Sequence, residues 1–201
     1  MTESKGRNKA MLLLIFLAFS APVIISWLIL SFTGISEKTG GNHGQLVDPP
    51  RPMPDMFLKD PLNPQLENAL HGKWSLVYLH EGKCLEVCVG NLYKMRQVRL
   101  ATGKHAPRMQ RVLVQFGPEE EPLNTGQLEP FAGQLLLQAD QTEGFPGREI
   151  FRLQEGEATM EKRRIYLVDP LGNLMLFYPE DAEPKGMIKD LKRLLRYSRI
   201  G

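Results

Sequence analysis

The sequence lacks most of the patterns that identify a common catalytic site or a nucleic-acid-binding surface. It has only two cysteines and four histidines among its 201 residues, and it contains no G-x-S-x-G, P-loop or H-E-x-x-H motif. The net charge is only +2, and lysine and arginine are spread along the chain without long runs of one sign. Hydrolase and kinase chemistry therefore have no support in the sequence. We exclude nucleic-acid binding, because the concentrated basic surface that it requires is missing.

Charged side chains are also missing from one long stretch near the N-terminus. Residues 10–32 are dominated by Leu, Ile, Phe and Ala and contain no charge, so at 1.5 Å per residue they can cross about 30 Å of hydrocarbon. Three basic residues lie within residues 1–9, and only Lys38 follows the apolar stretch closely. The positive-inside rule then predicts a cytoplasmic N-terminus, a single-pass anchor in the inner (cell) membrane and a periplasmic C-terminal domain.

A cleaved signal peptide is the competing interpretation of this N-terminal stretch. The only candidate cleavage site, Ala18-Phe-Ser20, is poor, and the apolar residues continue well beyond it. The apolar region of a signal peptide usually has only about 7–15 residues. We therefore favour an uncleaved transmembrane anchor.

Glycine and proline are concentrated in residues 33–65, between the predicted anchor and the first strongly apolar segment. The glycines come first and are followed by the run Asp48-Pro-Pro-Arg-Pro-Met-Pro54. This composition predicts a linker that is flexible at first and semi-rigid where proline dominates. Residues 66–201 are then predicted to form a single domain.

Hydrophobic periodicity predicts an α/β order of elements in this domain. The predicted strands are 74–79, 111–116, 135–137, 164–168 and 174–178, and the predicted helices start at about Val87, lie within 144–153, and start at Pro184. The order strand, helix, strand, insertion, hairpin, helix is that of a thioredoxin-like fold, a mixed central sheet flanked by helices. The first crossover predicts parallel neighbours, whereas the hairpin is antiparallel.

The last predicted helix has an apolar face and a basic face. The basic residues are Lys185, Lys189, Lys192, Arg193 and Arg196. A helix of this kind can contact anionic lipid or a charged partner. More commonly it packs on a sheet and leaves its polar face in solvent, which is the interpretation we favour.

The only two cysteines, Cys84 and Cys88, lie between the first predicted strand and the first predicted helix. The helix amides and dipole favour thiolate there, and a spacing of four residues lets the two sulfurs form a disulfide or hold one soft metal ion. A disulfide across so short a loop stabilises a domain by only about 2 kcal/mol, which weighs against a purely structural bridge. We expect Cys84 to be the exposed, attacking thiol and Cys88 the shielded, resolving thiol.

Three stretches together resemble the Sco/SenC family. They are Gly72-Lys-Trp-Ser-Leu-Val-Tyr-Leu79, the pair Cys84-x-x-x-Cys88, and Ile165-Tyr-Leu-Val-Asp-Pro-Leu-Gly172, and the resemblance covers about residues 70–197. It implies a membrane-anchored, thioredoxin-like protein that helps to build the copper centre of cytochrome c oxidase. Its partners would then be oxidase subunits or assembly factors, and its metal would be copper.

The chain departs from the family pattern in two places. The family motif usually has the sequence Cys-Pro-Asp-Val-Cys-Pro, whereas this chain has Cys84-Leu-Glu-Val-Cys88-Val. The family also carries a third copper ligand, a histidine, shortly before the hairpin, and this chain has none between residues 159 and 164. His80 is the histidine that we expect within reach of the cysteine pair, and Met160 is the alternative soft ligand.

Three functions remain open for the domain. It is a thiol–disulfide oxidoreductase that keeps client cysteines reduced through Cys84 and Cys88, a Cu(I) metallochaperone that uses both thiolates, or a non-catalytic docking subunit. Two thiolates are enough for linear Cu(I), but stable Cu(II) binding normally needs an added imidazole. We therefore place redox maintenance slightly ahead of copper delivery.

Overall fold

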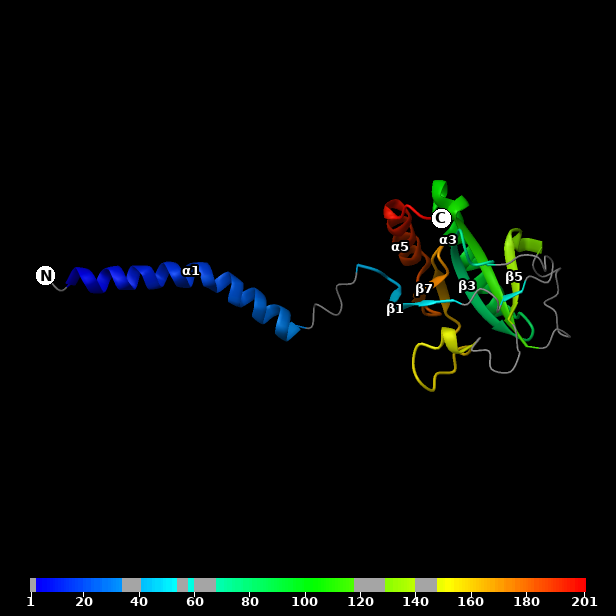
Figure 1. Ribbon diagram of the computed structural model, residues 1–201, viewed down its shortest axis with the longest axis horizontal. Coiled ribbons are helices and arrows are strands. Elements are labelled where there is room, and N and C mark those ends of the chain that lie inside the picture. Colours follow the sequence, from blue (N-terminus) through cyan, green and yellow to red (C-terminus); the bar gives the residue numbers. More distant parts are fainter. Residues whose placement is uncertain (1–2, 34–40, 54–57, 60–67, 118–128, 140–147) are drawn as a thin grey trace. The chain divides into compact units, whose positions relative to one another are not determined.

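The computed structural model describes residues 3–33, 41–53, 58–59, 68–117, 129–139 and 148–201. The chain divides into two compact units, Met1–Gly41 and Asn42–Gly201. In the first unit, helix α1 (Glu3–Thr33) contains the segment Met11–Ile29, which is long and apolar enough to cross a membrane (Figure 1). The predicted N-terminal apolar helix is confirmed, and it begins within the segment predicted to be a cytoplasmic tail.

The second unit is built on a mixed β-sheet. Its described strands are β1 (Gln45–Pro52), β2 (Leu58–Lys59), β3 (Trp74–Glu81), β4 (Met109–Phe116), β5 (Gln134–Ala139), β6 (Ile165–Val168) and β7 (Asn173–Tyr178). They lie in the spatial order β1-β7-β6-β3-β4-β5-β2. Strands β3, β4 and β5 are parallel, whereas the other neighbouring pairs are antiparallel. The predicted parallel crossover, the hairpin and the thioredoxin-like fold class are confirmed.

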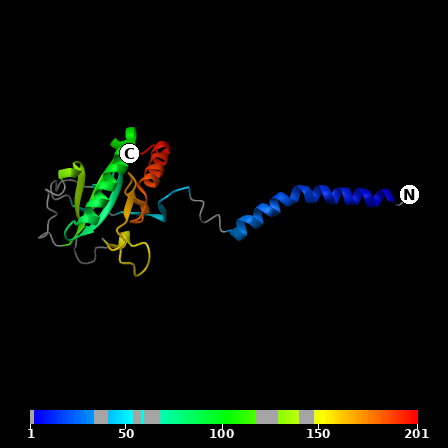
Figure 2. The same cartoon turned by 180° about the vertical axis from the view of Figure 1, so that it is seen from behind.

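Helices α3 (Glu86–Ala101) and α5 (Pro184–Tyr197) pack together over one face of this sheet (Figures 1 and 2). The buried faces of both helices meet strand side chains that alternate toward them. This core comprises, among others, Leu76 and Leu113 of the sheet, Leu92, Met95 and Val98 of α3, and Met187, Leu191 and Leu195 of α5. The 3₁₀ helices η1 (Gly103–Arg108) and η2 (Glu129–Phe131) follow α3 and precede β5.

The opposite face of the sheet has its own apolar cluster. Because successive strand residues alternate between faces, Val77 and Val112 point away from the two helices and pack here. Phe151 covers them from the 3₁₀ helix η3 (Glu149–Phe151), and its ring lies 5.1 Å from that of Tyr166. The sequence predicts a helix within residues 144–153. Of this segment the structure describes residues 148–153, where the single helical turn is η3.

Strand β1 lies inside the segment predicted to be a linker, so that prediction is wrong for residues 45–52. The strand pairs antiparallel with β7 at the edge of the sheet, where proline is tolerated because only one side needs hydrogen bonds. The buried carboxylate of Asp190 in α5 accepts hydrogen bonds from the backbone N–H groups of His43 (2.7 Å) and Gly44 (2.9 Å). The compact unit therefore begins at Asn42 rather than at the predicted residue 66.

Candidate functional site

The site begins at the C-terminal end of β3, which runs two residues further than predicted. Its parallel pairing with β4 continues through His80, opposite Gln115, to Glu81, opposite Phe116. The prediction that this strand ends at Leu79 is therefore wrong by two residues. Gly82 then turns the chain at a φ of 73°, a left-handed conformation that glycine adopts at little cost.

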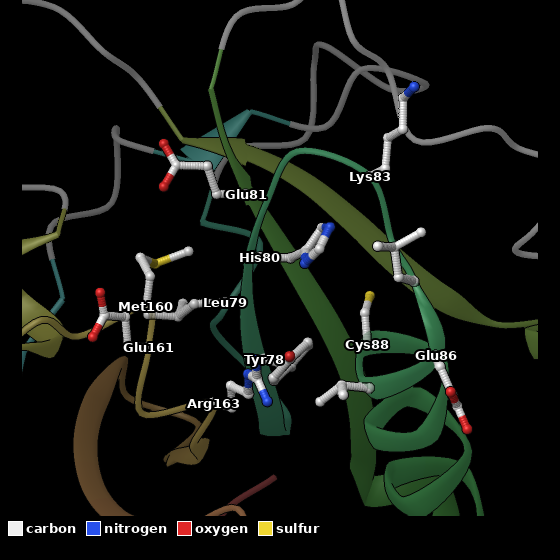
Figure 3. A pocket seen from close by; sticks show the side chains of 12 residues that line it. Tyr78, Leu79, His80, Glu81, Lys83, Glu86, Cys88, Met160, Glu161 and Arg163 are labelled. Atoms are coloured by element: carbon white, nitrogen blue, oxygen red, sulfur yellow. The ribbon is translucent and has the colours of Figure 1, made fainter.

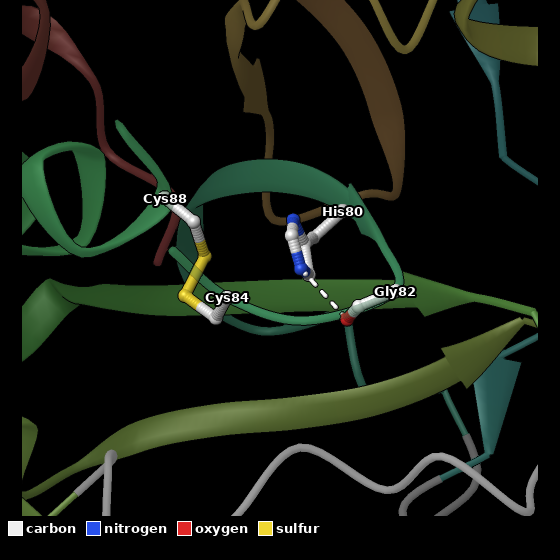
Figure 4. Close-up of a disulfide and its surroundings, with 4 residues drawn as sticks. All are labelled: His80, Gly82, Cys84 and Cys88. Carbon is white, nitrogen blue, oxygen red and sulfur yellow. Dashed lines mark hydrogen bonds between the residues drawn. A yellow bond between two sulfur atoms is a disulfide. The ribbon is translucent and has the colours of Figure 1, made fainter. Parts of the chain in front are cut away.

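Cys84 and Cys88 are joined by a disulfide at the start of α3, with their Cα atoms 5.2 Å apart (Figure 4). Cys88 lies in the first turn of the helix, whereas Cys84 precedes the N-cap residue Leu85. Their exposed fractions are only 2% and 3%, so the expectation of an exposed Cys84 is wrong. The reason is that Cys88 faces the apolar core beneath α3, and the residue bonded to it is drawn into the same core.

A cavity of about 590 Å³ opens beside the disulfide (Figure 3). Its lining includes Tyr78 and His80 of β3 and Cys88 of α3, together with Met160 and Arg163 from the segment before β6. Of the two cysteines, which are almost equally buried, Cys88 belongs to this lining and Cys84 does not. Met160, the predicted alternative ligand, lies in the wall of the same cavity, whereas the other three histidines are not part of it.

The imidazole of His80 is oriented by the turn that follows it. Its Nε2 lies 2.9 Å from the carbonyl oxygen of Gly82 (Figure 4), and a carbonyl can only accept, so Nε2 carries the proton and Nδ1 keeps its lone pair. Burial lowers the pKa of His80, against smaller opposing effects from the bond to Gly82 and from the Glu81 carboxylate. The ring is therefore neutral at pH 7 and available as a ligand.

The structure brings together all three site residues predicted from the sequence. The ligand atoms of His80, Cys84 and Cys88 lie within 4.8 Å of one another. Once the disulfide is reduced, this set offers two thiolates and one imidazole, the donors that suit soft ions such as Cu(I) or borderline ions such as Zn²⁺. The same reduction supplies a dithiol for exchange chemistry.

Three polar side chains near the disulfide were not singled out from the sequence. Arg163 lines the cavity with its backbone in the left-handed region (φ 45°) and forms an ion pair of 3.3 Å with Glu180. Tyr78 lies near Asn91, a buried α3 residue three positions after Cys88, and burial raises the pKa of the Tyr78 hydroxyl. The one available signal was that Arg163 falls in the segment where the resembled family has its missing histidine.

A protein-family model described as "Transmembrane-like, thioredoxin-like, C-terminal domain" matches residues 74–198. This match covers more than half of the 201 residues, so the chain belongs to that family. No curated protein matches the chain in sequence.

Solved structures of Sco proteins share this fold. ScoI of Bradyrhizobium japonicum with copper bound is 24% identical, with 71% of this chain and 98% of that chain covered and a TM-score of 0.53. Yeast Sco1 with copper bound is 18% identical, with 76% and 96% covered and a TM-score of 0.61. BsSco, described as having a disulfide switch and as a member of the Sco family of cytochrome c oxidase assembly proteins, is 14% identical, with 77% and 99% covered and a TM-score of 0.53. At these identities the similarity shows the fold, and it confirms the predicted Sco-like architecture.

Proposed function

We propose that the protein is a membrane-anchored thiol–disulfide oxidoreductase that keeps client cysteines reduced during assembly of the copper centre of cytochrome c oxidase. The observation that carries the proposal is the Cys84–Cys88 disulfide, placed at the start of a helix and next to an open cavity. The similarity in fold to proteins described as copper-bound Sco proteins and oxidase assembly factors supports the choice of client.

In the proposed reaction, the reduced pair transfers two electrons to a client disulfide. The helix dipole favours thiolate at Cys88, which attacks one client sulfur, forms a mixed disulfide and displaces the first client thiolate. The Cys84 thiolate then attacks the Cys88 sulfur, which closes the Cys84–Cys88 bond and releases the second client thiolate. A membrane dithiol reductant restores the reduced pair, and the reaction cycle then starts again.

Single-cysteine variants of the full-length chain test this reaction. In Cys84→Ser, Cys88 remains and nothing can resolve the mixed disulfide, so a reductant-sensitive adduct with the client should accumulate on non-reducing gels of membranes. Cys88→Ser should give no adduct. If neither variant forms an adduct, the exchange reaction is refuted. An adduct formed only by Cys88→Ser would instead make Cys84 the attacking thiol and overturn the order given above.

Cu(I) delivery is the second candidate, and the position of His80 favours it. A neutral imidazole with a ring nitrogen within 4.8 Å of both sulfurs completes a three-ligand site for Cu(I) as cargo. Anaerobic Cu(I) titration of the reduced full-length chain tests this role. A carrier should bind one Cu(I) tightly, His80→Ala should weaken that binding, and His105→Ala, outside the cavity, should leave it unchanged. Equal binding by both variants would exclude His80 as a ligand.

A further inference from the structure

The outer face of α5 carries basic residues that the proposed thiol chemistry does not use. Lys185, Lys189, Lys192, Arg193 and Arg196 are all exposed, and we refer to these five residues as the basic stripe. At 3.6 residues per turn, all five fall within an arc of roughly 100° around the helix axis. The buried apolar face of α5 lies on the opposite side, so the stripe points away from the core.

The helix α5 offers almost no acidic charge to the three lysines of the basic stripe. Asp190 is the only acidic residue of α5, and it is 7% exposed. Its carboxylate is already occupied by the backbone N–H groups of His43 and Gly44 and by His43 Nδ1 at 3.1 Å. Among the residues that the structure describes, the three lysines of the stripe form no salt bridge.

The basic stripe also lies next to the point where the chain from α1 enters the domain. The ring of His43 packs directly on α5, because a Cβ added at Gly186 would lie 2.7 Å from it. Only residues 34–41 connect Thr33, the last residue of α1, to Asn42. Even when fully extended, this connection spans at most about 30 Å. A domain held this close to a membrane meets its surface at a high effective concentration.

We infer that the basic stripe docks on the anionic phospholipid surface of the membrane that α1 spans. The inference rests on the proposed membrane anchoring and is independent of the proposed thiol chemistry. Each basic residue close to an anionic surface strengthens binding about five-fold, and salt screens this attraction. The contact is electrostatic and without insertion, because the apolar face of α5 is already buried in the core. None of the residues that line the Cys88 cavity belongs to α5, so docking leaves the cavity accessible.

Lysine acylation of the full-length chain in lipid nanodiscs measures this contact. Discs that contain phosphatidylglycerol are compared with discs of phosphatidylcholine alone, and acylation rates are read by mass spectrometry. We expect Lys185, Lys189 and Lys192 to react several-fold more slowly in the anionic discs, and we expect added salt to remove the difference. Lys83 and Lys162, which are exposed and outside α5, serve as internal references and should react equally in both discs.

Two charge variants complete the test. Arg193→Gln with Arg196→Gln weakens the stripe but keeps its three reporter lysines. The affinity for the anionic surface should fall by roughly 25-fold if each charge contributes about five-fold, so the several-fold protection of the lysines should be lost. Lys73→Gln with Lys162→Gln removes the same charge from elsewhere on the surface, keeps Lys83 as the reference, and should leave the protection intact. If the arginine variant does not fold, a salt titration of the unaltered chain tests the same electrostatic contact, because added salt should remove the protection of the three lysines.

Three results would overturn the inference. Equal acylation of the stripe lysines in both kinds of disc would refute the docking inference and leave the proposed anchoring and thiol chemistry untouched. Protection that needs an added acidic protein would assign the basic stripe to a protein partner instead. A chain that does not stay in the discs would refute the anchoring as well, whereas the adduct gels test the thiol chemistry separately.

Discussion

His80 shows how the chemistry of one residue depends on where its strand ends. A solvated loop histidine would titrate near its ordinary pKa, whereas His80 is half-buried at the end of β3 and oriented by the carbonyl of Gly82. Burial outweighs the hydrogen bond and lowers its pKa. The neutral ring next to the disulfide is therefore a consequence of strand pairing rather than of the local sequence.

The lowered pKa predicts that His80 makes the domain less stable in mild acid. Between pH 6.5, the ordinary pKa, and the lower pKa of the folded state, the unfolded chain binds a proton that the folded chain excludes. The free energy of unfolding therefore falls as the pH is lowered through this range. Above it, His80 contributes no pH dependence. Urea denaturation of wild type and His80→Gln at about pH 7.5 and about pH 5 measures the effect. His80→Gln should lose less stability than wild type, and equal losses would contradict the assignment.

At the scale of elements, the edge strand β1 depends on one close approach to its neighbour. A Cβ at Gly44 would lie 2.4 Å from Leu176 Cδ2 and 2.7 Å from Tyr178 Cε1, both on β7. The same glycine donates its N–H to Asp190. The start of β1 is thus held between the sheet and α5 at a position where any side chain would collide.

This geometry predicts opposite effects of two glycine-to-alanine changes. Gly44→Ala should lower the free energy of unfolding by about 1–3 kcal/mol, because it overpacks the contact with β7. Gly90→Ala, in the middle of α3 with no atom within 4 Å of the added Cβ, should raise it by about 0.5–1 kcal/mol. Denaturant melts of both variants measure the difference, and a neutral Gly44→Ala would show that β1 is not held as described.

At the scale of the whole molecule, orientation in the membrane determines which compartment the cavity faces. The proposed function needs the domain in the periplasm, which we predict from the basic residues that precede the span. A reporter fused after Gly201 should be active only if it works in the periplasm. The same fusion without residues 1–33 should remain in the cytoplasm and serves as the control. Strong activity of a cytoplasm-only reporter on the full chain would contradict the predicted topology and the function that depends on it.

The sequence by itself determined the features that depend on near neighbours in the chain. The strand formers from Trp74, the hairpin around Asp169 and the amphipathic pattern after Pro184 each carry a complete local signal, and the structure confirms all three. The position of the cysteine pair between a strand and a helix followed from the same patterns. The apolar span was equally clear, because crossing hydrocarbon requires only length and composition.

Only the tertiary structure decided the features that depend on distant partners. Residues 45–52 have the composition of a linker and become a strand because the edge of β7 supplies hydrogen-bond partners. His80 joins β3 because β4 continues to pair with it, and Cys84 is buried because Cys88 faces the core. The far wall of the cavity, including Arg163, comes from a segment that the sheet brings next to α3. No local pattern records these contacts, because burial and pairing arise from residues far apart in the chain.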